Sequence, residues 1–166
     1  PEARIRAIAE REGWDLAGCA IADVAQPIDA ARHAAQLVQD RRAAVLMKGS
    51  LHTDELMSVV VARDSGLRTS RRISHVFVMD LPAHDRPLLV SDAAINIAPT
   101  LSVKADIVRN AIDVARALGI ELPKIALLSA VETVNAAIPS TQDAAVLTEM
   151  AARGEIEGAI LHGPLA

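Results

Sequence analysis

The sequence has 166 residues, a formal net charge of −4 and 51% apolar residues, which is enough apolar material for a sizeable core and argues against disorder. The acidic balance, with one Trp, one Phe and no Tyr, argues against a protein that binds nucleic acid. The single cysteine excludes an intrachain disulfide, and no apolar run is long enough to span a bilayer, so we expect a cytoplasmic protein with no membrane partner.

The first part of the chain alternates between predicted helices and predicted strands. The spacing of apolar residues predicts helices over 2–12, over 27–40 and from Thr53 to about Asp64. Short apolar runs predict strands over 19–22 and 43–47.

A polar turn follows the second of these predicted strands and leads into a helix. Its candidate site residues are Lys48, Gly49, Ser50, His52 and Thr53. Helix N-termini attract phosphate, but Asp54 and Glu55 occupy the first turn of this helix, so an anion here would depend on Lys48 or on arginine side chains.

The period of the sequence changes near Ser70. Strands are predicted over 73–79 and 88–91, joined by a turn over 82–87, and we expect them to form an antiparallel pair. The pattern then predicts the following elements: a helix over 101–118 with Ser102 as its N-cap, a strand over 123–128, a helix that opens with a capping box at 140–143 and closes at Gly154, and a strand over 159–161.

This order of elements predicts an α/β protein with a mostly parallel sheet and two lobes, residues 1–70 and 71–166. Four polar clusters follow predicted strands, over 48–53, 91–100, 129–133 and 162–164. Ligands of parallel sheets bind at the carboxyl ends of strands, so these clusters predict a binding site along one edge.

Several residue types in these clusters could bind a phosphate. Arginine forks bind phosphate oxygens, and four arginines cluster before residue 73: Arg63, Arg68, Arg71 and Arg72. A solvated linker is the alternative for each of them, and we favour Arg68 and Arg71 as phosphate ligands. His52 is a candidate acid or base, whereas His75 in an apolar strand is more often a core residue. The five histidines are scattered, so no metal is predicted.

Two loops supply further candidate side chains. Ser91, Asp92 and Asn96 lie in the strand-to-helix loop, for which an ordinary turn and helix cap is the alternative. Ser129 and Thr133 carry hydroxyl groups that could hold phosphate oxygens.

The segments LMKGSLHTDELM, GLRTSRRISHVFVMD, SDAAINIAPT, LSAVETVN, IPSTQDAA and HGPLA resemble the phosphate acetyltransferase/phosphate butyryltransferase family over residues 43–166. The resemblance implies a three-layer αβα fold, like that of isocitrate and isopropylmalate dehydrogenases, with a cleft between two lobes that would include Gly163. It also implies a homodimer that moves an acyl group between coenzyme A and phosphate without a tightly bound cofactor or metal.

Two departures from the family pattern matter. Val59 stands where typical phosphate acetyltransferases carry an arginine, and GLRTSRR is closer to the butyryltransferase branch, so we expect Arg68 and Arg71 to take the phosphate role instead. Butyryl is the alternative acyl group. The chain also lacks the family's later Ser-Arg-Gly stretch, so we expect an internal fragment of a protein about twice as long. The rival interpretations are a metal- and nicotinamide-dependent decarboxylating dehydrogenase, for which no clustered Asp ligands are found, and a catalytically silent binding or dimerisation domain.

Overall fold

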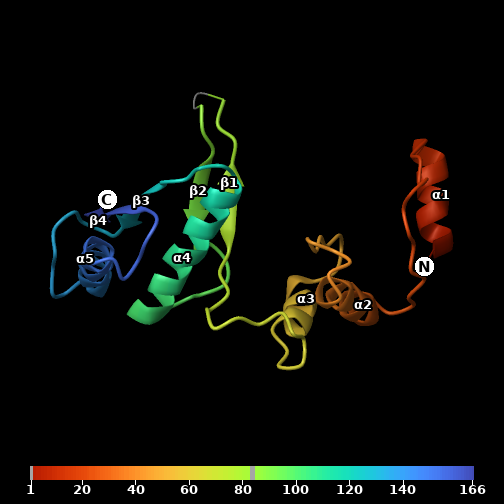
Figure 1. Cartoon of the computed structure of the whole chain (residues 1–166), viewed down its shortest axis with the longest axis horizontal. Helices are drawn as coiled ribbons and strands as arrows, with labels where there is room; N and C mark the ends of the chain where they lie inside the picture. The colour runs from red at the N-terminus through yellow and green to blue at the C-terminus, as the bar shows by residue number, and fades with distance from the viewer. Residues whose placement is uncertain (1, 83–84) are drawn as a thin grey trace. The chain divides into compact units, whose positions relative to one another are not determined.

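The computed structural model describes residues 2–82 and 85–166, and its backbone divides into two compact units, Pro1–Ser70 and Arg71–Ala166 (Figure 1). The division falls where the sequence changes from helical periodicity to the β-branched run before residue 79. Each unit is described separately below.

Unit 1 contains three helices, α1 (Glu2–Glu12), α2 (Pro27–Gln39) and α3 (Thr53–Val60). The helices predicted from apolar spacing are therefore confirmed. Helices α2 and α3 pack against each other through a small core of Ala31, Ala35 and Val59.

Helix α3 ends about four residues earlier than the sequence predicted. The Ser65 hydroxyl donates a hydrogen bond of 2.8 Å to the carbonyl of Val60, and Gly66 has a φ of 63°, so the chain turns instead of continuing as a helix. The predicted C-terminal boundary near Asp64 was therefore wrong.

The two strands predicted in unit 1, over 19–22 and 43–47, were wrong for this structure, since its described residues contain no strand there. Val45 is 80% exposed and Met47 is 96% exposed. An extended apolar segment becomes a strand only when a second strand satisfies its backbone hydrogen bonds, and in the described part of unit 1 none lies beside it.

Unit 2 begins with an antiparallel hairpin of β1 (Val76–Met79) and β2 (Leu88–Ser91), in which Val76 faces Ser91 and Met79 faces Leu88. The predicted antiparallel pair is confirmed, although β1 starts three residues later than expected. The predicted turn over 82–87 includes residues 83 and 84, which lie outside the described residues.

The remaining elements of unit 2 are α4 (Leu101–Ala117), β3 (Lys124–Leu128), α5 (Pro139–Ala152) and β4 (Ile160–Leu165). Strands β3 and β4 pair in parallel. The core is formed by one apolar stripe of α4 together with residues of α5, β4 and the turn between them: Ala105, Val108, Ile112, Leu147, Ile156 and Leu161.

Three local predictions in unit 2 need correction. Thr100, not Ser102, is the N-cap of α4, because the chain is already helical at residue 101. Helix α5 starts at Pro139 with Ile138 as N-cap and no side-chain cap, since proline fixes a helical φ at the first position, so the predicted capping box is absent. Strand β4 runs through 162–164 instead of ending before them.

The architecture is mixed α/β, and the described strands form two separate two-stranded sheets, one antiparallel and one parallel. The expected parallel arrangement is therefore present in β3 and β4, whereas the strand-end clusters of β2 and β3 do not share one continuous sheet among the described residues. In the part of the chain that is described, no helix is long and apolar enough to cross a membrane.

Candidate functional site

The loop that follows β2 is organised around the carboxylate of Asp92. Its Oδ1 accepts hydrogen bonds from the backbone N–H groups of His75, Ala94 and Ile95, each at 3.2 Å. Its Oδ2 accepts the backbone N–H of Asn96 at 3.0 Å and also the side-chain amide of Asn96. A short acidic side chain that binds the N–H groups just after it is an ordinary way to close a turn, and here it also ties the loop to the residue before β1.

These contacts favour the ionised form of Asp92. Burial alone would raise the pKa of this carboxyl group, but the side-chain amide of Asn96 and the backbone N–H groups of Ala94, Ile95 and Asn96 together lower the pKa to about 2. A carboxylate with this pKa is ionised throughout the neutral range and is a weak base. Asp92 is therefore suited to shaping the loop and not to acting as a general base near neutral pH.

Asn96 and Ser91 extend the same network to the segment before β1. The Asn96 amide Nδ2 donates to the carbonyl of Ile73 at 3.0 Å, and the Asn96 Oδ1 accepts from Nε of Arg72 at 3.4 Å. The Ser91 hydroxyl donates to the carbonyl of His75 at 2.7 Å. The predicted site residues Ser91, Asp92 and Asn96 thus lie together and hold the segment 72–75 against the loop.

Helix α4 holds this segment from its other side. Asp106 Oδ2 accepts the backbone N–H of Arg72 at 2.9 Å. The Asn110 amide donates to the carbonyl of Arg72 at 2.8 Å and to the hydroxyl of Ser74 at 2.9 Å. Asp113 forms an ion pair with the guanidinium of Arg71.

Sequence reasoning missed the three α4 residues. Asp106, Asn110 and Asp113 are spaced at i, i+4 and i+7, which places them in one row along a helix, next to the apolar stripe that fills the core. That spacing was visible in the sequence, but the segment 71–74 that these residues bind lies 34 to 42 residues earlier and nothing in its sequence indicates which residues it contacts.

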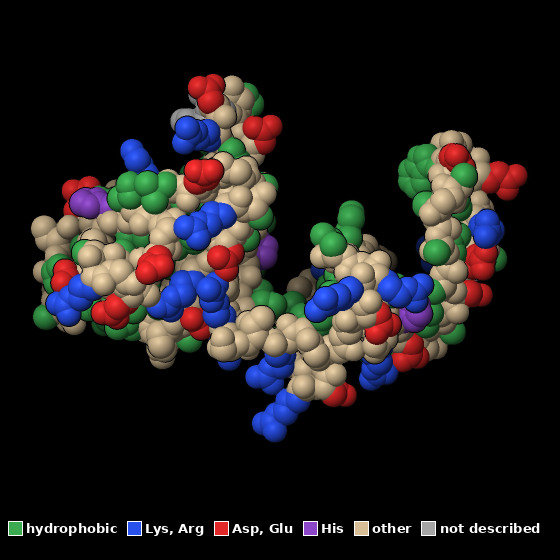
Figure 2. All heavy atoms as spheres, viewed as in Figure 1, with side chains coloured by type: hydrophobic (Ala, Val, Ile, Leu, Met, Phe, Trp, Pro, Cys, Tyr) green, Lys and Arg blue, Asp and Glu red, His purple; other side chains and the backbone are tan. Residues whose placement is uncertain are grey.

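The predicted arginines fall in different units. Arg71 lies in unit 2 with its guanidinium beside Asp113, whereas Arg68 is an exposed residue of unit 1. In Figure 2, Lys and Arg side chains lie interspersed with Asp and Glu side chains over the visible face of the larger unit.

The clusters at β3 and β4 do lie next to each other. The N–H of Ser129, just after β3, donates to the carbonyl of Leu165 in β4 at 2.7 Å, and the Ser129 and Ser140 hydroxyls are 2.7 Å apart. A Cβ on Gly163 would lie 2.6 Å from Cβ of Leu127, so this glycine lets the strands approach closely. Thr133 is exposed in the loop after β3.

The polar turn of unit 1 is exposed at all five candidate residues: Lys48, Gly49, Ser50, His52 and Thr53. The Lys48 Nζ donates to the carbonyl of Leu51 at 3.2 Å. The carboxylate of Glu55 accepts the backbone N–H of His52 at 3.3 Å, so an acidic side chain already occupies the N-terminus of α3. An anion at this turn would therefore still depend on Lys48 or on arginine side chains.

His75 lies just before β1 with its ring half-buried. The ring contacts Phe77 edge-on, with centroids 4.4 Å apart and planes at 72°. Its Nδ1 is buried and has no hydrogen-bond partner among the described residues. The ring contact agrees with a packing role for His75, but His75 lies outside β1 and is only half-buried, so the prediction of a satisfied core residue was wrong. His52 is the exposed histidine of the predicted site.

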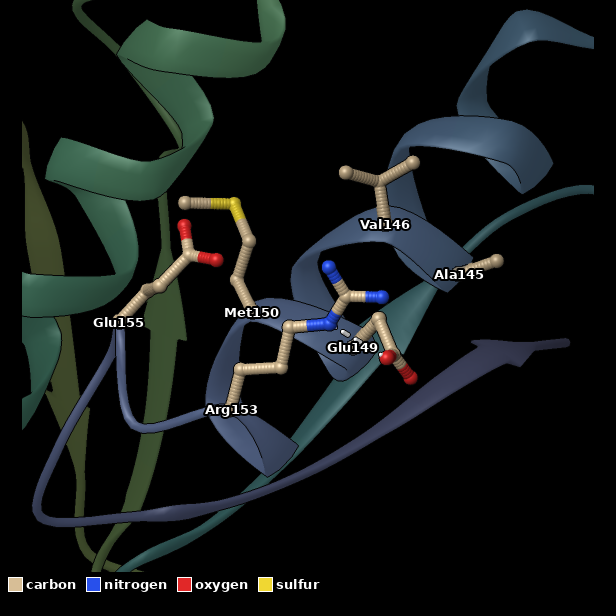
Figure 3. A pocket seen from close by; sticks show the side chains of 6 residues that line it. All are labelled: Ala145, Val146, Glu149, Met150, Arg153 and Glu155. Atoms are coloured by element: carbon tan, nitrogen blue, oxygen red, sulfur yellow. Dashed lines mark hydrogen bonds and ion pairs between the residues drawn. The ribbon is translucent and has the colours of Figure 1, made fainter.

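Two surface hollows lie away from the predicted residues. One of about 510 Å³ is formed by α5 and the turn after it, where the Arg153 guanidinium points to Glu149 in a 2.7 Å ion pair and Met150 lies near Glu155 (Figure 3). Another of about 290 Å³ lies between α2 and α3. No predicted site residue lines either hollow, and within residues 2–82 and 85–166 no three His, Cys, Asp or Glu side chains are grouped to hold a metal.

Comparison with solved structures first indicates the class of protein to which this fold corresponds. The chain matches a solved structure, a branched-chain phosphotransacylase from Enterococcus faecalis V583, with a TM-score of 0.75 and 36% identity. The match covers 86% of this chain and 51% of that chain. The backbone therefore has the fold of part of a phosphotransacylase.

The family follows from the sequence comparisons. Residues 3–166 match the family described as phosphate acetyl/butaryl transferase, and the chain belongs to that family. It is 56% identical to a phosphate acetyltransferase of Rhizobium meliloti over all of this chain and 52% of the relative. It is 41% identical to a phosphate butyryltransferase of Clostridium acetobutylicum over 98% of this chain and 54% of the relative. The chain spans about half the length of the curated relatives that it matches.

Proposed function

We propose that the complete protein moves an acetyl group reversibly between coenzyme A and inorganic phosphate. The observation that carries this proposal is the family match over residues 3–166, together with 56% identity to a phosphate acetyltransferase against 41% to a phosphate butyryltransferase. Butyryl transfer by the same chemistry is the second candidate. It is favoured by the GLRTSRR segment and by the likeness to a branched-chain phosphotransacylase.

The reaction is a direct acyl transfer. The thiolate sulfur of coenzyme A attacks the carbonyl carbon of the acyl phosphate, a C–S bond forms, and the C–O bond to phosphate breaks with phosphate as the leaving group. This chemistry requires a base that takes the thiol proton and positive charge that stabilises the phosphate oxygens. Neither requirement calls for a metal or a tightly bound cofactor.

We assign the charged and basic roles to three residues of this chain. His52 is an exposed residue of the polar turn of unit 1 and is the candidate base, while Arg68 and Arg71 are the candidate phosphate ligands. Asp92 is not proposed as the base, because hydrogen bonds lower its pKa to about 2.

The remaining predicted residues are assigned to substrate contacts or to the shape of the loops. Lys48, Gly49, Ser50 and Thr53 form the polar turn, and Ser129 and Thr133 present hydroxyl groups after β3. Ser91, Asp92 and Asn96 shape the loop after β2. Gly163 allows β4 to pack closely on Leu127 of β3.

For the complete polypeptide we further propose the three-layer αβα arrangement with a mostly parallel sheet that is typical of isocitrate and isopropylmalate dehydrogenases. A homodimer and a cytoplasmic location belong to the same proposal. They rest on the family resemblance of the segments SDAAINIAPT and HGPLA.

The first test is thioester formation from coenzyme A with acetyl phosphate and then butyryl phosphate, on this chain and on the complete protein side by side. We expect the complete protein to be active, with a higher kcat/KM for acetyl phosphate. Preference for butyryl phosphate would select the second candidate. Tight binding of coenzyme A in a calorimetric titration without turnover of either substrate would instead support a silent binding domain.

A second test concerns the phosphate ligands. Arg68→Ala should raise the KM for phosphate by more than about tenfold, because a charge-assisted hydrogen bond contributes about 1.5–3 kcal/mol. Arg63→Ala is the matched control, since Arg63 is an exposed arginine of the same unit to which no role is assigned. An unchanged KM in the Arg68 variant would remove Arg68 from the site.

A further inference from the structure

From the sequence, Arg72 is a less favoured phosphate ligand than Arg68 and Arg71, yet the structure holds it at three points. Its backbone N–H donates to Asp106 at 2.9 Å, and its carbonyl accepts from Asn110 at 2.8 Å, both on α4. Its side-chain Nε donates to Asn96 of the loop after β2 at 3.4 Å. The backbone is thus fixed from one side while the guanidinium extends to the loop on the other.

The acidic groups around Arg72 are engaged by other partners. The Asp92 carboxylate accepts hydrogen bonds from the surrounding N–H groups, Asp113 pairs with Arg71, and Asp106 lies 3.6 Å from Arg109. The contact from Arg72 to the loop is to the neutral amide oxygen of Asn96 and not to a carboxylate. The positive charge of Arg72 is therefore held beside the loop without a carboxylate ion pair among the contacts described here.

We propose that Arg72 binds a phosphoryl group of the substrate, and that Asn96 and Asn110 position it for this contact. The contact with Asn96 uses the N–H on Nε, and the two Nη groups have the planar fork geometry that matches two phosphate oxygens. The exposure of Arg72 leaves it accessible to a ligand. This inference rests on the proposed function, because that function supplies a phosphoryl group as phosphate, acyl phosphate or coenzyme A.

Preorganisation is the physical reason for assigning this role to Arg72. A long arginine side chain loses much rotamer freedom when it binds an anion, and a backbone already fixed at both its N–H and its carbonyl reduces the further loss. The Asn110 amide donates both to the carbonyl of Arg72 and to the hydroxyl of Ser74. Asn110 therefore acts on a bound ligand by holding residues 72–74 in place. Asn110 is accordingly a positioning residue.

The test uses the complete protein with Arg72→Ala, Arg72→Lys and Asn110→Ala, and with Arg153→Ala as the matched control. Arg153 is an exposed arginine of the same unit that pairs with Glu149 on α5, away from the loop. Initial rates in both directions give separate KM values for phosphate and for coenzyme A. Far-ultraviolet circular dichroism and the thermal midpoint of each variant establish that it is folded.

We expect Arg72→Ala to raise the KM for phosphate about tenfold or more with little change in the KM for coenzyme A, and Arg72→Lys to recover part of the loss. A rise in the KM for coenzyme A alone would assign the bound phosphoryl group to coenzyme A instead. Asn110→Ala should raise the same KM as Arg72→Ala by a smaller factor, whereas a purely structural role would lower the thermal midpoint without moving either KM. Unchanged KM values in the Arg72 variants would overturn the proposal.

Failure of the proposed function is detected separately. If the complete wild-type protein transfers no acyl group, calorimetric titrations with inorganic phosphate and with coenzyme A are compared for wild type and Arg72→Ala. Binding that is at least about tenfold weaker in the variant would support Arg72 as a phosphoryl ligand without the reaction. Equal binding, or binding to neither protein, would overturn it.

Discussion

The substitution Asp92→Asn tests whether the carboxylate of Asp92 holds the loop after β2. Both oxygens of Asp92 accept hydrogen bonds from N–H groups, including the backbone N–H of His75 and of Asn96. An asparagine keeps the shape of the side chain but replaces one acceptor oxygen with an NH₂ group. That group would face N–H donors and leave them unsatisfied, so we expect a loss of stability.

The size of the loss follows from the pKa. A fall of the pKa from 3.8 to about 2 corresponds to about 2.4 kcal/mol of stabilisation of the folded state, at about 1.36 kcal/mol for each pKa unit. Asp92 is partly exposed, and screening by water and salt reduces this figure. We therefore expect Asp92→Asn to lower the free energy of unfolding by about 1–2 kcal/mol at pH 7.

The pH dependence has a definite sign. Because the folded-state pKa lies below the unfolded value, the stabilisation is fully present above about pH 4 and is lost as the pH falls towards 2. Urea unfolding followed by circular dichroism at several pH values between 7 and 3 measures it. The difference between wild type and Asp92→Asn should be roughly halved by pH 3.

Glu149→Gln is the control, because Glu149 is an exposed acid whose ion pair with Arg153 is expected to contribute at most about 1 kcal/mol. If Asp92→Asn and Glu149→Gln had equal effects at pH 7, the hydrogen bonds of Asp92 would not stabilise the fold as argued. A difference between wild type and Asp92→Asn that stayed constant between pH 7 and pH 3 would refute the electrostatic reasoning specifically.

Two further substitutions test the packing of unit 2 by thermal or urea unfolding. Gly163→Ala should lower the free energy of unfolding by about 1–3 kcal/mol, because the new Cβ would lie 2.6 Å from Cβ of Leu127. Gly49→Ala is the control and should change it by less than about 0.5 kcal/mol, because a Cβ at Gly49 meets open space. Similar effects of the two substitutions would contradict the close packing at Gly163. Thr141→Val should cost about 1–3 kcal/mol, since the fully buried hydroxyl accepts the N–H of Asn135 at 2.9 Å, and an unchanged midpoint would show that this N–H finds another partner.

Helices and the hairpin could be predicted from the sequence because their signals are local. The apolar stripe of α4 recurs at helical spacing, and Gly119 with a φ of 84° stops the helix as expected. The loop residues Ser91, Asp92 and Asn96 could also be singled out, because polar side chains directly follow a strand. What each of them binds could not be predicted, since His75 and Ile73 lie about 17–23 residues away.

The same distinction explains why the sequence could not separate Arg72 from Arg71, and why Arg71 was favoured. In the sequence the two are adjacent arginines before a strand, with nothing to separate their roles. The difference arises from α4, where Asp113 takes the side chain of Arg71 and Asp106 takes the backbone of Arg72. A contact of this kind depends on tertiary packing, which the order of residues alone does not reveal.

The strands illustrate a different limit of sequence reasoning. The runs 43–47 and 159–161 are both short, apolar and β-compatible, yet only the second forms a strand. The reason is that β3 lies beside it in parallel register, with Ile125 facing Leu161, and supplies the backbone partners that a strand requires. Pairing with β3 also extends β4 through Gly163 and Pro164, two residues that in isolation indicate a loop. The strand ends at Leu165, whose carbonyl accepts the N–H of Ser129. An apolar run thus specifies that a segment is to be buried, and the neighbouring strand determines that it is buried as a strand.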